Sequence, residues 1–179
     1  PFPHRIIQSG RPMQQTPLYD RLRDAGAVFG QVGGWERAFW FDPAGNHDPE
    51  KLSYRNSEPW RDAVRAECEG VRDGVGLMDH GGFTRYEVSG ADAADFMDRV
   101  FCTSLPAVGR VKLAYMLTPG GKLWSESIVA RISAQRFLLF GPTLADLRDL
   151  DWLNGLVGPQ QDVNVVRGGE EDAALLLMG

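Results

Sequence analysis

The order of the apolar segments along the chain is the feature that most constrains its fold. Short runs with strand-like alternation come in pairs, and single amphipathic helical segments separate them. A strand–helix–strand rhythm, which would indicate a parallel sheet, does not occur. The pattern therefore predicts an α+β fold, with helices packed on a mostly antiparallel sheet. The expected helices are residues 18–25, 59–72, 93–101 and 144–156, and the expected strands are residues 75–78, 84–89, 112–117, 123–132, 137–140, 163–166 and 173–178.

Two of the expected helices have a face that should be buried. In the third helix, apolar residues recur at i, i+3, i+4, i+7 and i+8, and in the fourth, leucines recur every third residue behind a capping Thr143. Residues 118–122 (Thr-Pro-Gly-Gly-Lys) have turn chemistry and predict a hairpin between their flanking strands. The side chains expected to face the core are Ala93, Phe96, Met97, Val100, Phe101, Leu147, Leu150 and Leu153.

Residues 27–59 lack a clear period and are expected to be a long irregular segment. The glycines of residues 30–34 suggest a flexible bend before Trp35, without the strand–helix context of a dinucleotide site. The segment is too aromatic for disorder, so we expect it to pack down and form the wall of a pocket. At the other end of the chain, the apolar run of residues 173–179 predicts a buried strand.

Composition excludes several classes of protein. The net charge is −5 and the basic residues are interleaved with acids, which argues against a nucleic-acid surface. No apolar stretch approaches the roughly 20 residues that span a bilayer, and no signal peptide is present, so we expect no membrane contact. Cys68 and Cys102 form no disulfide framework and suit a reducing compartment. The three histidines are scattered, which predicts no metal site.

Spacing alone gives few catalytic candidates. Asp79 and His80 follow an expected strand and are either an acid/base pair or, more commonly, a strand-end polar cluster. Cys102 follows a helix, with no helix N-terminus or neighbouring cation to stabilise a thiolate, so we expect a packed thiol. On these grounds the chain is an α+β domain of unknown role.

Three longer segments, in order and at consistent spacing, resemble one family. It is the aminomethyltransferase family of the glycine-cleavage T-protein and the dimethylglycine and sarcosine dehydrogenases, and the chain is most similar to the C-terminal folate domain of those dehydrogenases. The first segment holds Gly-Arg-Pro at 10–12, Thr-Pro-Leu-Tyr-Asp-Arg-Leu at 16–22, Gly-Ala-Val-Phe-Gly at 26–30 and Gly-Trp-Glu-Arg at 34–37. The second holds residues 74–79, 86–93 and Phe96. The third holds Gly109, residues 115–121 and residues 137–139.

The resemblance implies the N-terminal part of the aminomethyltransferase folate-binding fold. Residues 1–15 would be a linker from an upstream flavin oxidase domain, and residues 16–179 a folate-binding domain that is incomplete at its C-terminus. The implied cofactor is tetrahydrofolate, which would capture a one-carbon unit from a small N-methyl amine; FAD would bind only in the upstream domain. The implied location is the bacterial cytoplasm, or the mitochondrial matrix in a eukaryote.

The resemblance also assigns cofactor-binding residues. Trp35, Glu36 and Arg37 fall on the family's Gly-Trp-Glu-Met motif, which lines the folate cavity, with Arg37 in place of the Met as in the dehydrogenase group. The family's Asn-Asp pair, whose Asp is the acid, falls on Phe101 and Cys102. A carboxylate near the folate nitrogens contributes roughly 10²–10⁴-fold as a general base, and a neutral thiol does this poorly. No catalytic residue is therefore assigned. In the third segment, Tyr115 and Met116 complete the expected folate-binding set.

Three functions remain open from the sequence. The first is the folate part of a flavin-linked N-methyl amine dehydrogenase. The second is a stand-alone aminomethyl or methyl transferase of the T-protein type, against which Arg37 and the missing acid count. The third is a non-catalytic folate-binding module, which Cys102 at the acid position favours.

Overall fold

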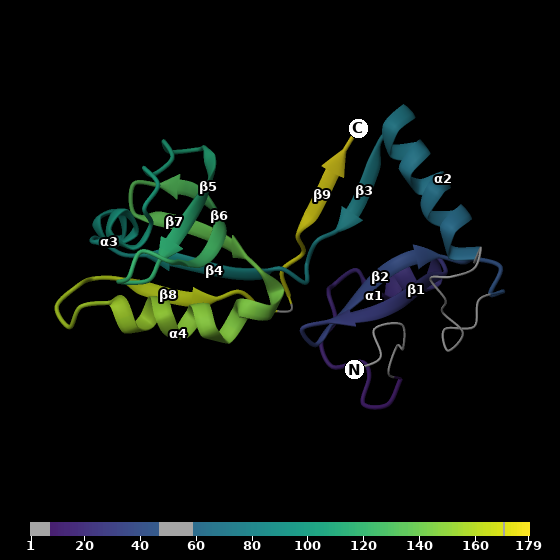
Figure 1. Cartoon of the computed structure of the whole chain (residues 1–179), viewed down its shortest axis with the longest axis horizontal. Coiled ribbons are helices and arrows are strands. Elements are labelled where there is room, and N and C mark those ends of the chain that lie inside the picture. The colour runs from purple at the N-terminus through teal and green to yellow at the C-terminus, as the bar shows by residue number, and fades with distance from the viewer. Residues whose placement is uncertain (1–7, 47–58, 170) are drawn as a thin grey trace. The chain divides into compact units, whose positions relative to one another are not determined.

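The computed structural model describes residues 8–46, 59–169 and 171–179 (Figure 1). Its contacts divide the chain into two compact units: unit 1 is Pro1–Gly82 with Glu170–Gly179, and unit 2 is Phe83–Gly169. Unit 1 contains α1 (Tyr19–Asp24), β1 (Ala27–Val32), β2 (Trp35–Phe41), α2 (Pro59–Asp73), β3 (Gly76–Asp79) and β9 (Leu175–Met178). Unit 2 contains β4 (Thr84–Ser89), α3 (Ala93–Val100), β5 (Val111–Leu117), β6 (Leu123–Ser133), β7 (Arg136–Gly141), the 3₁₀ turn η2 (Thr143–Ala145), α4 (Asp146–Leu156) and β8 (Asn164–Arg167).

In unit 1, β1 and β2 form an antiparallel hairpin from Ala27 opposite Phe41 to Val32 opposite Trp35. Gly33 and Gly34 connect the strands with φ values of 60° and 89°, a left-handed backbone that glycine adopts without steric cost. The expectation of an irregular segment and a flexible bend is therefore wrong for residues 27–41. Residues 47–58 of that segment lie outside the described part of the chain.

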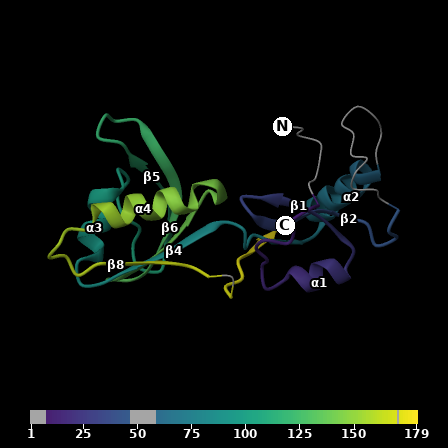
Figure 2. The same ribbon diagram turned by 90° about the horizontal axis from the view of Figure 1, so that it is seen from below.

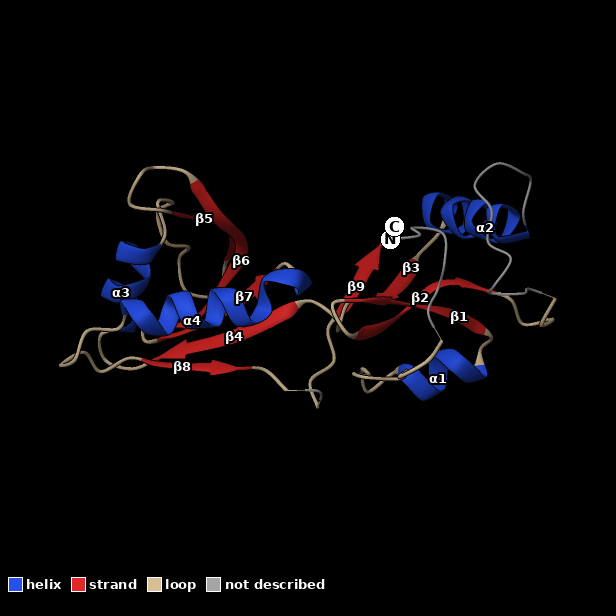
Figure 3. Ribbon diagram, turned by 60° about the horizontal axis from the view of Figure 1, so that its bottom comes forward, coloured by secondary structure: helices blue, strands red, loops and turns tan. Residues whose placement is uncertain are grey.

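The strands β3 and β9 form a second antiparallel pair in unit 1, beside α2 (Figure 3). Both strands and the helix were expected from the sequence, but the burial of the C-terminal strand was not predicted correctly. Leu175 is 52% exposed and Leu177 is 70% exposed. The reason is that Leu177 lies opposite Leu77, which is itself 66% exposed, so this pair of side chains lies at the surface of the ribbon.

Unit 2 is built on a five-stranded antiparallel sheet in the order β5-β6-β7-β4-β8. The expected hairpin joins β5 to β6, where the amide of Thr118 donates to the carbonyl of Lys122 and Gly121 has a φ of 74°. The helices α3 and α4 lie beside the sheet (Figure 2), and their side chains contribute to the core on one of its faces. The sequence-based prediction of an α+β fold with a mostly antiparallel sheet is confirmed.

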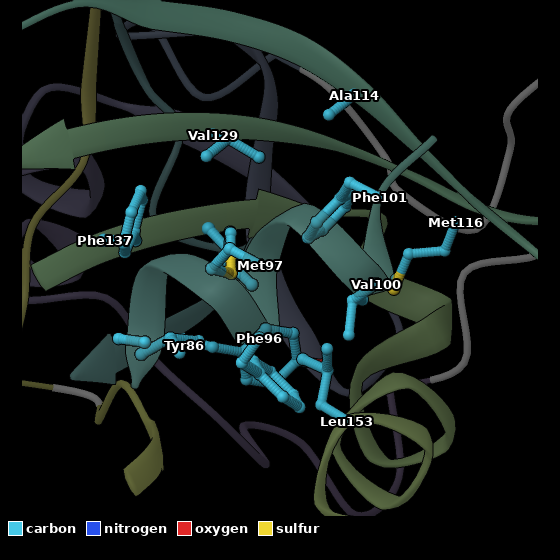
Figure 4. Packing of buried hydrophobic residues seen from close by; sticks show 13 residues of the cluster. Tyr86, Phe96, Met97, Val100, Phe101, Ala114, Met116, Val129, Phe137 and Leu153 are labelled. Atoms are coloured by element: carbon cyan, nitrogen blue, oxygen red, sulfur yellow. The ribbon is translucent and has the colours of Figure 1, made fainter. Parts of the chain in front are cut away.

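The core of unit 2 lies between that sheet face and the two helices (Figure 4). The predicted face of α3 is confirmed, because Phe96 and Met97 are fully buried and Phe101, just after the helix, is 3% exposed. The predicted inner face of α4 is wrong at Leu147, which is 67% exposed. At about 100° per residue, Leu147 lies roughly 120° around the helix from the buried Leu153. Thr143 is not its cap, because it begins the 3₁₀ turn that precedes the helix.

Polar contacts also attach α4 to the sheet. The hydroxyl of Tyr86 donates to the carbonyl of Asp146 at 2.5 Å, and the hydroxyl of Ser125 donates to the buried carboxylate of Asp149, also at 2.5 Å. Burial and the neighbouring carboxylates raise the pKa of Tyr86 well above its ordinary value, so the phenol stays a neutral donor. None of the helices in the described ranges has the length and apolar character needed to cross a membrane.

Candidate functional site

The expected folate-binding residues of β2 occupy different environments in unit 1. Trp35 and Glu36 are buried, with 6% and 4% of their surface exposed, and Arg37 is half-buried. The backbone of Gln14 fixes this part of the hairpin: its amide donates to the carbonyl of Gly34, and its carbonyl accepts from the amide of Glu36. Residues near the start of the described chain therefore act as an additional strand contact beside β2.

The carboxylate of Glu36 is occupied by an arginine that sequence reasoning gave no role. Nε of Arg11 donates to Oε1 of Glu36 at 2.9 Å, and its terminal nitrogen pairs with the other carboxylate oxygen. The same guanidinium donates to the carbonyl of Phe29 at 3.1 Å. The hydrogen bond to Glu36 raises the pKa of Arg11. Glu36 thus links β2 to the segment before α1; the only sequence signal was the Gly-Arg-Pro motif at residues 10–12.

A mostly apolar pocket of about 410 Å³ lies in unit 1, bounded by residues of β2, α2, β3 and β9. Arg37, Glu67 and Asp79 contribute charged groups to its lining, and Trp40, Met78 and Met178 contribute apolar ones. The expectation that residues 27–59 help to line a pocket therefore holds for β2, although Trp35 lies outside this lining.

The Asp79-His80 pair forms a polar cluster at the end of β3. This was the commoner of the two interpretations of the sequence, the other being an acid/base pair. The carboxylate of Asp79 accepts from the hydroxyl of Thr16 at 2.5 Å and from the amide of Gly81 at 2.9 Å. The amide of His80 donates to the carbonyl of Ala174 at 2.8 Å. Burial, and the nearby charge of Arg37, lower the pKa of His80, which favours the neutral imidazole.

The other four expected residues lie in unit 2, along the edge of β5. Phe101 forms an isolated antiparallel bridge with Met116, and both side chains are buried in the core, with 3% and 1% exposed. The amide of Cys102 donates to the carbonyl of Tyr115 at 3.0 Å. These contacts bring all four backbones together, although Phe101 and Met116 direct their side chains into the core.

The expectation of a packed thiol at Cys102 is wrong, because its side chain is exposed. Phe101 has an extended backbone, with φ of −102° and ψ of 133°, and its side chain enters the core. In an extended segment the next side chain points to the opposite side, which places Cys102 on the face of the sheet away from α3. The position that the resemblance assigns to the family's acid is therefore at the surface of unit 2.

That outer face of the sheet is rich in exposed apolar side chains. Val111 and Leu113 of β5 are 64% and 44% exposed, and Ile128 of β6, directly opposite Leu113, is 45% exposed. Tyr115 is half-buried in the same row of alternating residues. Cys102 and Tyr115 thus border an apolar surface on unit 2, whereas Trp35, Glu36 and Arg37 belong to unit 1. Within the described residues, no group of three or more His, Cys, Asp or Glu side chains is placed to hold a metal ion.

Comparison with known proteins identifies related sequences and a related fold. The family described as the GCVT N-terminal domain matches residues 18–179. Mitochondrial dimethylglycine dehydrogenase of Mus musculus is 32% identical over 153 residues, which are 85% of this chain and 17% of that protein. Sarcosine oxidase subunit alpha of Rhizobium meliloti (strain 1021) is 29% identical over 175 residues, 94% of this chain and 16% of that protein. The chain thus spans about a sixth of the length of these relatives.

A solved structure shows the same fold. The glycine cleavage system aminomethyltransferase T from Bartonella henselae superposes with a TM-score of 0.74 at 22% identity, covering 93% of this chain and 41% of that one. At this identity the likeness concerns the fold alone. It agrees with the expectation that the chain has the N-terminal part of the aminomethyltransferase fold.

Proposed function

Because the chain belongs to the family of GCVT N-terminal domains, we propose that it is the folate-binding part of a flavin-linked N-methyl amine dehydrogenase. Relatives named dimethylglycine dehydrogenase and sarcosine oxidase subunit alpha support this branch over the stand-alone transferases. In this role the chain receives a one-carbon unit, as an iminium or formaldehyde derived from the amine, and passes it to tetrahydrofolate.

The observation that carries the proposal is the exposed Cys102 beside Tyr115, on a sheet face with exposed apolar side chains. A folate has flat rings that need apolar and aromatic contacts, and N–H groups that need acceptors. Leu113 and Ile128 offer the apolar contacts, and Tyr115 offers an aromatic ring with a polar tip. The residues on this face therefore offer the kinds of contact that a folate needs.

The resemblance also assigns residues of β2, in unit 1, to folate binding. Arg37 is proposed to offer a cation to a carboxylate of folate, and the buried side chains of Trp35 and Glu36 hold the strand in place. Phe101 and Met116 act in the same way in unit 2, because they fix the backbone that carries Cys102 and Tyr115. Bound tetrahydrofolate supplies the nucleophilic nitrogens that capture the one-carbon unit.

The flavin step belongs to a part of the protein outside this chain, so FAD is assigned to an upstream oxidase domain and no residue here is proposed to bind it. Residues 1–15 are proposed as the linker to that domain. One relative is named mitochondrial and the other comes from a bacterium, which fits a protein of the mitochondrial matrix or the bacterial cytoplasm.

The test is an anaerobic titration of the chain with tetrahydrofolate, followed by an assay of methylenetetrahydrofolate formed with formaldehyde. Saturable binding and product formation faster than the uncatalysed condensation are expected. Binding without any rate increase would favour the second candidate, a folate-binding module without catalysis. Cys102 at the proposed acid position supports that candidate. Absence of binding would overturn both.

A further inference from the structure

The carboxylate missing at Cys102 has a counterpart two strands away on the same sheet face. In β6, Glu126 lies directly opposite Tyr115, and opposed residues in an antiparallel pair project from the same face as neighbours. On the other side of Tyr115, its carbonyl accepts from the amide of Cys102. The order across the sheet is therefore Cys102, Tyr115, Glu126.

The dimensions of this row suit one small ligand. Adjacent strands are about 4.8 Å apart, so the backbones of Cys102 and Glu126 are separated by about 10 Å, with Tyr115 between them. A ligand lying over Tyr115 therefore reaches the side chain of Glu126 without leaving the apolar surface made by Leu113 and Ile128.

The charge of Glu126 is otherwise unexplained. The strands of the five-stranded sheet contain two acids, Glu87 and Glu126. Glu87 pairs with Arg136 at 2.7 Å, and this contact lowers its pKa. Glu126 is exposed, and its side chain makes no hydrogen bond or ion pair within the described residues. An unpaired carboxylate set among exposed apolar side chains is an acceptor available to a ligand.

Resting on the function proposed above, we infer that Glu126 is the carboxylate that contacts tetrahydrofolate in this chain. It accepts hydrogen bonds from N–H groups of the bound folate, taking over from the acid that Cys102 has replaced. The sequence motifs do not identify Glu126, because it lies on β6, whereas the expected folate-binding residues Tyr115 and Met116 lie on β5.

The experiment compares three variants with the parent chain by calorimetric titration with tetrahydrofolate. Glu126→Gln keeps the shape of the side chain and removes its charge, so the dissociation constant is expected to rise roughly 10- to 100-fold, the usual effect of losing a hydrogen bond to a charged group. Glu87→Gln is the matched control, expected to change affinity less than about 2-fold. Cys102→Asp added to Glu126→Gln restores a carboxylate to the row and is expected to recover most of the lost affinity.

Melting temperatures of all variants show whether the fold is retained. The inference is overturned if Glu126→Gln binds like the parent, or if Glu87→Gln loses as much affinity. If the parent chain does not bind tetrahydrofolate, the proposed function itself is overturned. If the parent binds and Glu126→Gln binds equally well, only the role of Glu126 is overturned.

Discussion

Unit 2 packs its helices on one face of its sheet, so that Phe96, Met97 and Leu153 are fully buried, whereas the described part of unit 1 buries few apolar side chains. In the described part of unit 1, the buried apolar side chains are Trp35 and Trp40, and the β3–β9 ribbon remains exposed. Unit 1 instead relies on polar links such as the ion pair between Arg11 and Glu36. The difference indicates that unit 2 carries its own hydrophobic stability and unit 1 depends more on specific polar contacts.

The largest expected effect is in the core of unit 2. Phe96→Ala removes a ring that is fully buried, and it should lower the free energy of unfolding by about 3–5 kcal/mol. Phe39→Ala in unit 1 removes a ring that is 44% exposed, and about 1 kcal/mol or less is expected. Denaturant unfolding measures both. Equal losses for the two variants would show that the units do not differ as described.

The next effect concerns the polar anchor of unit 1. Glu36→Gln leaves the guanidinium of Arg11 in a site where its side chain is only 10% exposed, without its charged partner. A loss of about 3 kcal/mol is expected, since breaking a buried pair strands the other charge. Hydrogen exchange should show faster opening of β1 and β2 while α3 is unaffected. An equal loss of protection in both units would contradict the role of this ion pair as an anchor of unit 1.

A smaller effect should follow from the neutral imidazole of His80. Its pKa in the folded protein lies below its ordinary value of 6.5, because burial and the charge of Arg37 disfavour the cation. As the pH falls below about 6.5, the unfolded chain binds the proton first, so stability decreases until the pKa of the folded state is passed. Melting curves from pH 7.5 to 5 measure this, and His80→Gln should flatten the dependence. A parent chain more stable at pH 5.5 than at pH 7 would refute it.

The smallest effect is expected at Cys102. Because its side chain is exposed, Cys102→Asp should change the free energy of unfolding by no more than about 0.5 kcal/mol. Thermal unfolding against the parent chain is the measurement. A loss of several kcal/mol would mean that the residue is packed after all, as the sequence alone suggested.

Most of unit 2 could be predicted from the sequence because its information is local. Tyr86 and Val88 alternate with polar residues in β4, and the apolar positions of α3 repeat with the helical period, so one strand or helix reveals its own buried face. The resemblance to the family then located Cys102 and Tyr115, which the structure places side by side.

The rest depended on partners far away in the sequence. Glu36 is buried inside β2 only because Arg11, 25 residues earlier, meets it. The exposure of Leu177 depends on what covers β3 and β9, which the strand's own apolar pattern does not contain. Glu126 was missed as a candidate because the sequence does not reveal the strand register, which places it opposite Tyr115.

The pairing of β3 with β9 gives the chain a nested connectivity. All of unit 2 is inserted between these two strands, and the insertion begins and ends on neighbouring strands, since the amide of Gly168 donates to the carbonyl of Arg85 at 2.8 Å. The strands on the unit 1 side are likewise held together, from Asp79 opposite Leu175 onward. In the order of the chain, unit 2 therefore takes the place of the loop that would connect β3 and β9 in a simple hairpin. If a short turn replaced residues 83–169, unit 1 would become one continuous sequence. The removed residues would form a separate module whose two ends are neighbours in space.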